Sequence, residues 1–415
     1  MLPKSSKNTC KKIIKMHYAL FPKESHNLNL ENMDIIVPKE RGEDETRVAA
    51  TPDSVGKFLK LGAKVIVESG AGEKSSILDS AYENAGATLA SDPEKLYASD
   101  GIILKVGIPA EGEIDELSLM KKGSILLALL DPVKNKEKMK KLAERGVNAF
   151  SMEFIPRISR AQSMDVLSSQ SNLAGYKAVV DAAAEYGRAL PMMMTAAGTV
   201  TPAKVLILGA GVAGLQAVAT AKRLGAIVSA FDVRPDVKEQ VESLGGIFIE
   251  VESSETKDAE TSGGYAKEMS EDYKKQQAAL IHETLKKTDI AICTALIPGK
   301  PAPVLIPEEM VKDMQPGSVI VDMAVEAGGN CPISEVGKIV VKHGVKIMGH
   351  TNLPGRIATD ASALYANNLV NFLTPFFDKE TKEFKIDWED EIIKGTCITR
   401  DGVVVHELVK EKEGN

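Results

Sequence analysis

Short apolar runs alternate with helix-like windows along the chain from Met33 onward. The runs are continuous rather than alternating, which is typical of strands buried on both faces of a parallel sheet. They form two successive series, which predict two sheets. The first series is 34–38, 64–67, 101–106, 124–130 and 148–152, and the second is 204–208, 227–231, 246–251, 290–294, 318–323 and 346–348.

Helical windows separate these runs. Those at 52–61, 114–122 and 134–145 are each followed by glycine, a common helix C-cap. A long alanine-rich window at 165–190 lies between the two series, and another at 361–372 follows the second. The pattern therefore predicts an α/β protein with two doubly wound, Rossmann-like parallel-sheet domains joined by long helices.

Residues 1–32 differ from the rest, because they are rich in lysine, contain no arginine and lack the strand and helix rhythm. We expect a disordered extension or an upstream start codon, with an address signal as the alternative. The remaining chain is predicted to divide into an N-terminal-type domain, 33–157 plus 356–415, and a nucleotide-binding domain, 165–355, with 157–165 as the loop between them.

Composition narrows the function. Of 415 residues, 44% are hydrophobic and 26% charged, as in ordinary globular proteins. The 51 basic and 58 acidic residues sum to −7, so nucleic-acid binding has no electrostatic support. No uncharged stretch exceeds the 17 residues of 205–221 and 361–377, and the stretch 189–203 is too short and too polar for direct membrane insertion, which needs about 20 apolar residues. The cysteines are far apart and predict neither disulfides nor a metal site: Cys10, Cys293, Cys331 and Cys397.

A Gly-x-Gly-x-x-Gly motif at 209–214 directly follows the predicted strand 204–208 and opens a helix. In that context Gly209 permits a tight turn, Gly211 lets the backbone approach a pyrophosphate, and Gly214 lets helix and strand pack closely. The motif predicts a dinucleotide site at a helix N-terminus, and a packing turn that binds nothing is the alternative. The candidates are Gly209, Gly211, Val212, Ala213 and Gly214.

The next predicted strand ends in an acid, Asp232, 18 residues beyond the motif's last glycine. A carboxylate there would accept hydrogen bonds from the adenosine ribose and repel a 2′-phosphate, which favours NAD(H). Arg234 leaves an NADP-type site open, since a nearby arginine can accommodate that phosphate. The candidates at this strand end are Asp232, Val233 and Arg234. Leu296, in the run 294–301 after a later strand, is expected to line the same cleft.

The segment between the domains is unusually polar. Residues 157–165 read Arg-Ile-Ser-Arg-Ala-Gln-Ser-Met-Asp, and Ser168 follows in the next helical window. From local sequence alone, a solvated loop with Asp165 as a helix N-cap is as reasonable as a binding loop.

Several longer runs closely resemble domain I of the proton-translocating NAD(P) transhydrogenases. They are 156–165, 168–176, 191–199, 263–269, 294–303 and 324–332. The likeness extends from about Met33 to the C-terminus. It implies a homodimeric NAD(H)-binding subunit that exchanges hydride directly with NADP(H) on domain III of a partner, coupled to proton movement through membrane domain II. It also implies a peripheral position on the cytoplasmic face of a bacterial inner membrane.

The resemblance assigns roles to individual residues. Arg157, Gln162, Asp165 and Ser168 match positions that hold the nicotinamide and its ribose and meet the partner's nucleotide. Tyr265 matches a residue on a mobile loop that closes over NAD. Hydride exchange between two nicotinamides needs positioning and water exclusion rather than a general base. The histidines at 282, 343, 350 and 406 are accordingly predicted to be structural.

Alanine dehydrogenase is the main alternative, because Glu40, Arg47 and Lys105 resemble its opening and its substrate lysine. That family's catalytic histidine would fall within 126–130, which contains none, and its catalytic aspartate corresponds to Glu326. Since oxidising an amine requires a positioned acid or base, alanine turnover is not expected. A second alternative is a module that senses NADH without chemistry.

Overall fold

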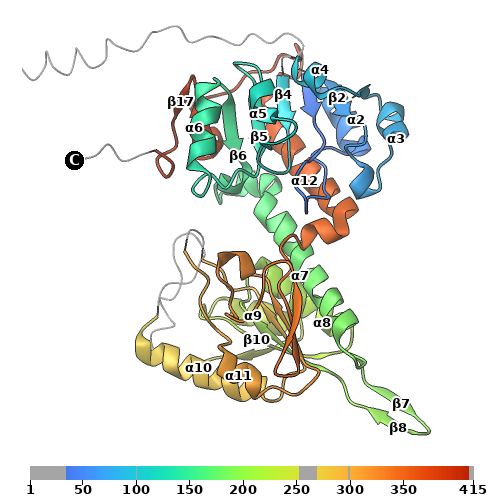
Figure 1. Ribbon diagram of the computed structural model, residues 1–415, viewed down its shortest axis with the longest axis vertical. Helices are drawn as coiled ribbons and strands as arrows, with labels where there is room; N and C mark the ends of the chain where they lie inside the picture. The colour runs from blue at the N-terminus through green and yellow to red at the C-terminus, as the bar shows by residue number, and fades with distance from the viewer. Residues whose placement is uncertain (1–33, 100, 252–268, 298–299, 411–415) are drawn as a thin grey trace, which may run out of the picture.

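The computed structural model describes residues 34–99, 101–251, 269–297 and 300–410. These residues form two lobes, each built on one large sheet, with helix α7 running from one lobe into the other (Figure 1). The α/β architecture with two parallel-rich sheets confirms the predicted fold class.

The first sheet contains the strand order β3-β2-β1-β4-β5-β6, which is the Rossmann order. These strands are parallel, and an antiparallel pair, β16 and β17, extends the sheet beyond β6. The strands are β1 Asp34–Val37, β2 Lys64–Glu68, β3 Thr88–Ala90, β4 Gly101–Leu104, β5 Ile125–Ala128, β6 Asn148–Ser151, β16 Cys397–Arg400 and β17 Val403–Val404.

The second sheet repeats that order as β11-β10-β9-β12-β13-β15 and ends in the antiparallel edge strand β14. The strands are β9 Lys204–Leu208, β10 Ile227–Phe231, β11 Ile247–Ile249, β12 Ile290–Cys293, β13 Val319–Asp322, β14 Ile339–Lys342 and β15 Val345–Met348. In each sheet the connections diverge between two central strands, β1 and β4 or β9 and β12, and ligands bind at such switch points.

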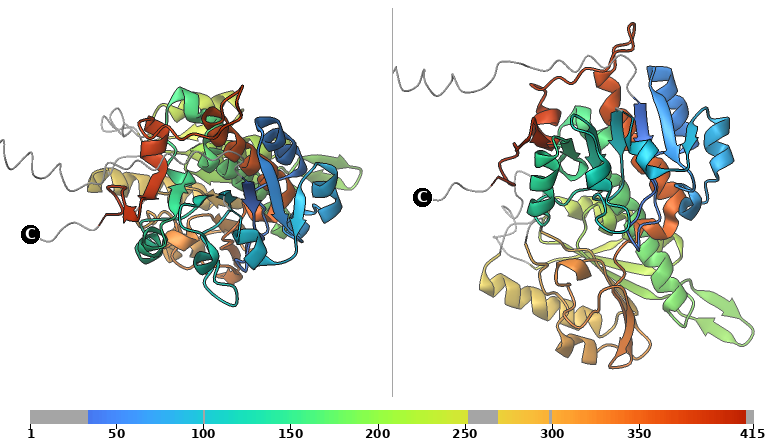
Figure 2. Two further views of the ribbon diagram at one scale, coloured as in Figure 1. Left: turned by 90° about the horizontal axis from the view of Figure 1, so that it is seen from above. Right: turned by 45° about the horizontal axis from the view of Figure 1, so that its top comes forward.

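Helices cover the sheets and join the lobes. They are α2 Pro52–Leu61, α3 Asp79–Asn84, α4 Pro93–Tyr97, α5 Glu116–Leu119, α6 Lys136–Glu144, α7 Val166–Glu185, α8 Val212–Arg223, α9 Val237–Ser243, α10 Glu271–Leu285, α11 Glu308–Lys312, α12 Ala358–Leu373 and α13 Glu391–Thr396. After the second sheet the chain returns through α12, which packs on α7 and α2 (Figure 2).

Local sequence explains the best-predicted helix. α2 begins at Thr51, whose side chain and that of Ser54 form a reciprocal capping box, with Pro52 in the first turn. It ends at Gly62 in the left-handed region, φ +97°. Its bounds are those predicted. The predicted helix 114–122 is only the single turn α5, and the window 165–190 ends as a helix at Glu185.

A two-stranded hairpin leaves the second lobe after α7. β7 (Met193–Thr195) pairs antiparallel with β8 (Gly198–Val200), and both project into solvent (Figure 1). The three methionines at its start are 60%, 44% and 75% exposed, at Met192, Met193 and Met194. A hairpin of this size is marginally stable alone, and its exposed apolar face is characteristic of a contact surface.

Candidate functional site

The glycine motif lies at the switch point of the second sheet. Gly209 follows β9 with φ +100°, a left-handed conformation that L side chains rarely adopt. Its carbonyl oxygen accepts a 2.8 Å hydrogen bond from the Thr294 hydroxyl at the end of β12. A Cβ added to Gly209 would lie 2.6 Å from that hydroxyl, so the turn and the neighbouring strand end are packed without room for a side chain.

The other two glycines serve different purposes. A Cβ at Gly214 would lie 1.9 Å from the Gly209 carbonyl oxygen, so this glycine is required by packing. A Cβ at Gly211 would meet only the Arg234 Nη2, at 4.0 Å. The protein interior therefore does not require glycine at 211, whereas a pyrophosphate approaching the backbone would.

Helix α8 starts at this loop without a side-chain cap, since Gly211 is its N-cap residue. The N–H groups at the start of a helix have no partner within the helix and can donate to an anion, and the helix dipole favours negative charge there. Val212 is 43% exposed and Ala213 half-buried in that turn. A dinucleotide's pyrophosphate fits both features.

Asp232, directly after β10, is buried to 9% exposure and fully engaged by donors. Its Oδ1 accepts from the Arg234 backbone N–H and Nε, both at 2.9 Å. Its Oδ2 accepts from the Ala210 backbone N–H and from the Arg234 Nη2, both at 2.8 Å. The carboxylate thus ties the glycine loop to the end of β10, and Val233 between the two packs partly into the core.

The loops after β12 and β13 complete this edge of the sheet. Leu296 is 51% exposed beside the half-buried Ala295. Asn330 is fully buried and its Nδ2 donates to the carbonyls of Ala295 and Pro303, at 2.9 and 2.8 Å. Among the described residues its Oδ1 has no hydrogen-bond partner. Asn330 therefore holds the two loops together.

Asp322, at the end of β13, holds the loop that follows this strand, and it was not among the residues predicted from the sequence. It is fully buried, and its two oxygens accept from three backbone N–H groups and one hydroxyl. The donors are Ala324, Asn330, Cys331 and the Ser334 hydroxyl, at 2.7–3.1 Å. An acid that ends a buried strand, as Asp232 also does, is the signal that would have identified it.

The polar segment 157–165 lies at the other end of α7. Asp165 is the N-cap of α7: its Oδ1 accepts from the Ser168 backbone N–H at 2.9 Å, and its Oδ2 from the Ser168 hydroxyl at 2.5 Å. Arg157 and Gln162 are exposed. Two of the four predicted nicotinamide residues thus form one cap, and the other two face solvent.

The same segment is held from the first lobe. Between Ser159 and Met164 it forms the short 3₁₀ helix η3, and the Ser163 carbonyl accepts from the side chains of Asn368 and Asn371 on α12, at 2.9 and 3.0 Å. Arg160 forks onto Asp390, the N-cap of α13, at 2.8 and 2.9 Å. These contacts fix the loop where the two lobes meet.

Helix α7 connects the two candidate regions directly. A Cβ at Gly175 would lie 2.0 Å from the Ala213 carbonyl, so α7 touches the start of α8 at this residue. Asp165 lies ten residues earlier, about 15 Å along the helix axis. An extended dinucleotide with its phosphates on α8 can cover that distance toward Asp165.

The switch point of the first sheet is filled by charged side chains. Lys105, after β4, is 1% exposed and lies 3.2 Å from Glu40 and 3.0 Å from Glu116. Burial alone would lower the pKa of Lys105, but the two carboxylates outweigh it and raise that pKa. Arg47 is 8% exposed and bound by Glu45 and by the Gln170 Oε1.

Several residues named in the predictions lie away from the candidate site or outside the described residues. Tyr265 and residues 1–32 belong to the part that the structure does not describe. His282 and His343 make surface pairs with Asp313 and Glu308. Within the described ranges, acidic, cysteine and histidine side chains form no cluster that could hold a metal, and no helix has the length and apolarity to cross a membrane.

The C-terminal domain model of alanine dehydrogenase/PNT matches residues 178–407, and the N-terminal domain model matches 36–174. The chain belongs to the alanine dehydrogenase/PNT family. Together the two models span both sheets, so the membership extends over nearly all described residues.

Within the alanine dehydrogenase/PNT family the chain shares high identity with transhydrogenases. It is 60% identical to the first section of NAD(P) transhydrogenase subunit alpha from Rhodospirillum rubrum, over 90% of this chain and 98% of that protein. A transhydrogenase structure from Sinorhizobium meliloti matches with a TM-score of 0.81 and 50% identity, covering 89% of this chain and 99% of the other. These matches confirm the predicted transhydrogenase resemblance and the oxidoreductase class.

Alanine dehydrogenase is a more distant relative. The enzyme of Bacillus subtilis is 30% identical over 92% of this chain and 95% of its own length. In this chain Arg47 and Lys105 have ion-pair partners of their own, Arg47 with Glu45 and Lys105 with Glu40 and Glu116.

Proposed function

We propose that this chain is the NAD(H)-binding subunit of a proton-translocating transhydrogenase. It binds NAD(H) at the second sheet and exchanges hydride directly with NADP(H) bound on the domain III of a partner subunit. The exchange is coupled to proton movement through membrane domain II. The chain itself attaches peripherally, on the cytoplasmic face of the bacterial inner membrane.

The observation that carries the proposal is the glycine loop at the second switch point. The open space at Gly211 and the uncapped start of α8 are two separate features that a dinucleotide would use, and Asp232 holds the glycine loop in place beside them. The transhydrogenase relatives, similar over nearly the whole chain, supply the reaction class.

The nicotinamide end is proposed to lie at segment 157–165. Arg157 and Gln162 are exposed on the loop that joins the lobes, so a partner nucleotide can reach them. Asp165 and Ser168 form the N-terminal cap of α7 beside them, and we assign their oxygens to the ribose or carboxamide of the nucleotide. Direct hydride exchange requires that the nicotinamide is held in position and that water is excluded.

Alanine oxidation is not supported by the first switch point. Lys105 is sealed between Glu40 and Glu116, so it offers no free charge to a substrate carboxylate. Strand β5, where that family's histidine would fall, ends in buried apolar side chains. A sensing module is disfavoured because binding alone requires no exposed loop at the nicotinamide end.

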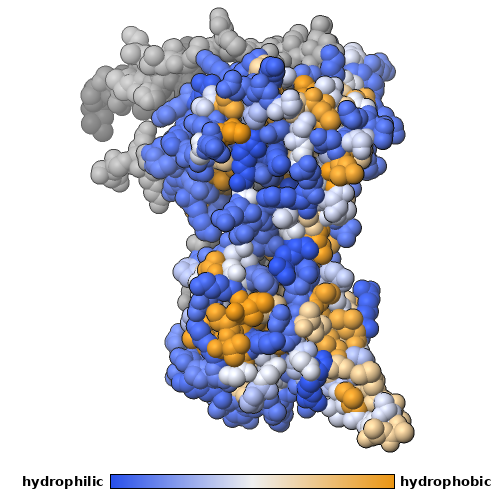
Figure 3. Space-filling view, turned by 45° about the vertical axis from the view of Figure 1, so that its right-hand side comes forward, coloured by the Kyte–Doolittle hydropathy of each residue, from blue (hydrophilic) through white to orange (hydrophobic). Residues whose placement is uncertain are grey.

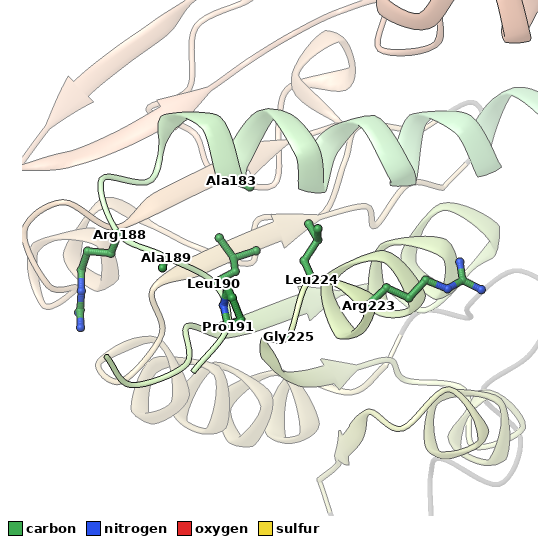
Figure 4. Close-up of a pocket in the computed structure, with 8 residues that line it drawn as sticks. All are labelled: Ala183, Arg188, Ala189, Leu190, Pro191, Arg223, Leu224 and Gly225. Carbon is green, nitrogen blue, oxygen red and sulfur yellow. The ribbon is translucent and has the colours of Figure 1, made fainter. Parts of the chain in front are cut away.

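We further propose that the chain is a homodimer that uses the β7–β8 hairpin. An apolar face extends over the hairpin and its base (Figure 3). At the base an open pocket of 550 Å³ lies between the ends of α7 and α8, where Leu190, Pro191 and Leu224 lie together while Arg188 and Arg223 point away (Figure 4). Sedimentation of the full chain tests this assembly.

The reaction is tested by mixing the purified chain with a transhydrogenase NADP(H)-binding domain and following reduction of an NAD analogue by NADPH. We expect transfer that depends on both proteins and no NADH formation from L-alanine plus NAD. NADH formation from alanine would overturn the proposal and make Glu326 a working acid. If neither assay shows a reaction while NADH still binds, the alternative of a module that senses NADH without chemistry is favoured.

Variants of the loop test the assignment of the nicotinamide end. Gln162→Ala or Arg157→Ala should slow hydride transfer far more than it weakens NADH binding, because the phosphates and adenosine are held elsewhere. Equal losses in rate and affinity would contradict the assigned role.

A further inference from the structure

At the ribose end of the candidate site Asp232 and Arg234 form an ion pair. Four hydrogen bonds of 2.8–2.9 Å reach the Asp232 carboxylate, and two of them come from the Arg234 guanidinium. The two side chains are 7% and 15% exposed. A carboxylate has about four acceptor positions, so this one is already saturated by the protein.

The pair brings a positive charge into the cleft. The Nη2 of Arg234 lies 4.0 Å from the Cβ position of Gly211, beside the proposed path of the pyrophosphate. A planar guanidinium at the ribose end is the side chain best suited to grip a 2′-phosphate, through paired hydrogen bonds. Here that fork is turned onto Asp232 instead.

We infer that Arg234 is a latent 2′-phosphate receptor that Asp232 keeps occupied, so that this one ion pair makes the chain selective for NAD(H) over NADP(H). The inference rests on the proposed function. It gives Asp232 a second effect besides repelling a 2′-phosphate, because the carboxylate also holds the guanidinium away from that phosphate.

The reaction itself explains why such a device is useful. Direct exchange between two nucleotides requires that each remain on its own subunit. If NADP(H) also occupied this cleft, both nicotinamides would be of one kind and no net transfer would follow. A saturated Asp232 excludes the 2′-phosphate by charge repulsion and also removes the cation that would compensate it.

The experiment compares NADH and NADPH binding to the full-length chain by nicotinamide fluorescence. Wild type is expected to bind NADH and to discriminate strongly against NADPH. Asp232→Ser removes the carboxylate and makes room, so NADPH affinity should rise by about 10- to 100-fold, the range expected for hydrogen bonds to a charged group. Asp232→Asn keeps the shape of the side chain and one acceptor oxygen for Arg234, and should show a smaller gain.

The matched control is the double variant Asp232→Ser with Arg234→Ala. Its NADPH affinity should return to about the wild-type level, because the cation is gone. The gain in Asp232→Ser should also weaken with added salt, as expected for an exposed charge pair.

The outcomes separate the inference from the function. If the double variant binds NADPH as well as Asp232→Ser does, or if neither Asp232 variant gains NADPH affinity while NADH binding persists, the latent receptor is refuted. If wild type binds neither nucleotide, the proposed function fails first and the inference fails with it.

Discussion

The two sheets have the same strand order, but a buried carboxylate occupies the switch point of the first and the switch point of the second is open. In the first, the chain's own carboxylate fills the space: Glu40 accepts from the backbone N–H groups of Val106 and Gly107, at 2.6 and 3.4 Å. In the second, the corresponding space is bordered by Gly209 and Gly211, and Gly211 leaves it open. A shared architecture therefore does not carry a shared binding capacity.

The two switch points differ because the charged side chains around the first are paired with one another. Around the first switch point, Lys105 is satisfied by Glu40 and Glu116, and Tyr97 donates to Glu116 at 3.0 Å. Burial raises the pKa of Glu40 although Lys105 opposes the shift. The backbone donors that could hold a ligand anion are thus already used by an internal one.

At the second switch point backbone donors remain available. The α8 N-terminus has no side-chain cap, and Asp232 ties down the loop rather than the helix end. An anion that arrives here meets N–H groups in place of a buried acid. The following predictions test this contrast, beginning with the largest effect.

Removing the cation of the first switch point should be costly. Lys105→Met leaves Glu40 and Glu116 without their shared partner, at 7% and 0% exposure. Breaking a buried pair on one side costs about 3–5 kcal/mol, so we expect a loss of that size in the free energy of urea unfolding.

The control for Lys105 is an exposed lysine in the same lobe. Lys134 pairs with Asp131 at 3.1 Å, but both side chains are at least half exposed. Lys134→Met should change stability by less than about 1 kcal/mol. Similar small losses in both variants would mean that the first switch point is not sealed by charge.

Two alanine substitutions in the glycine loop should act differently. Gly214→Ala places a methyl 1.9 Å from the Gly209 carbonyl, so backbone must move and overpacking should cost about 1–3 kcal/mol of stability. Gly211→Ala should fold normally, yet weaken NADH binding on the order of tenfold or more by crowding the pyrophosphate. Thermal unfolding and NADH titration separate the two.

Reversed behaviour would contradict the assignment of these glycines. If Gly211→Ala lost stability and kept NADH affinity, its open position would not be a ligand site. If Gly214→Ala were as stable as wild type, the close approach of α8 to the loop would have room that the structure does not show.

Much of this contrast could be predicted from sequence, where it depends on neighbours in the chain. The bounds of α2 follow from Thr51, Pro52 and Gly62, and the strand-turn-helix context predicts the loop at Gly209. Continuous apolar runs predict strands, because both faces of a parallel sheet are buried.

The rest depends on contacts between distant residues. Glu116 pairs with Lys105 from an adjacent turn that local pattern overestimated as a longer helix. The antiparallel edges β14, β16 and β17 reflect how the chain returns to each sheet. The fork of Arg234 onto Asp232 is a choice of rotamer, and sequence spacing alone could not distinguish it from a side chain free for phosphate.

The smallest expected effect concerns the loop between the two sheets. Arg160 binds Asp390 with side chains 47% and 19% exposed, the opposite extreme from Lys105. The hydrogen bond from Arg160 lowers the pKa of Asp390 below its ordinary 3.8. Because the folded pKa lies below the unfolded one, this stabilisation is present above about pH 4 and is lost as the pH falls through the folded pKa.

Arg160→Met should therefore cost less than about 1 kcal/mol at pH 6, and the difference from wild type should shrink as urea unfolding is repeated toward pH 3.5. Asp390→Asn provides the control, since an amide oxygen can still cap α13 by accepting from the Ile392 N–H at 2.7 Å. In that background Arg160→Met should show only the weaker pH dependence of the remaining pair between Arg160 and Glu391, at 3.2 Å. A difference that persists unchanged to low pH would show that Arg160 holds the loop through uncharged contacts rather than through Asp390.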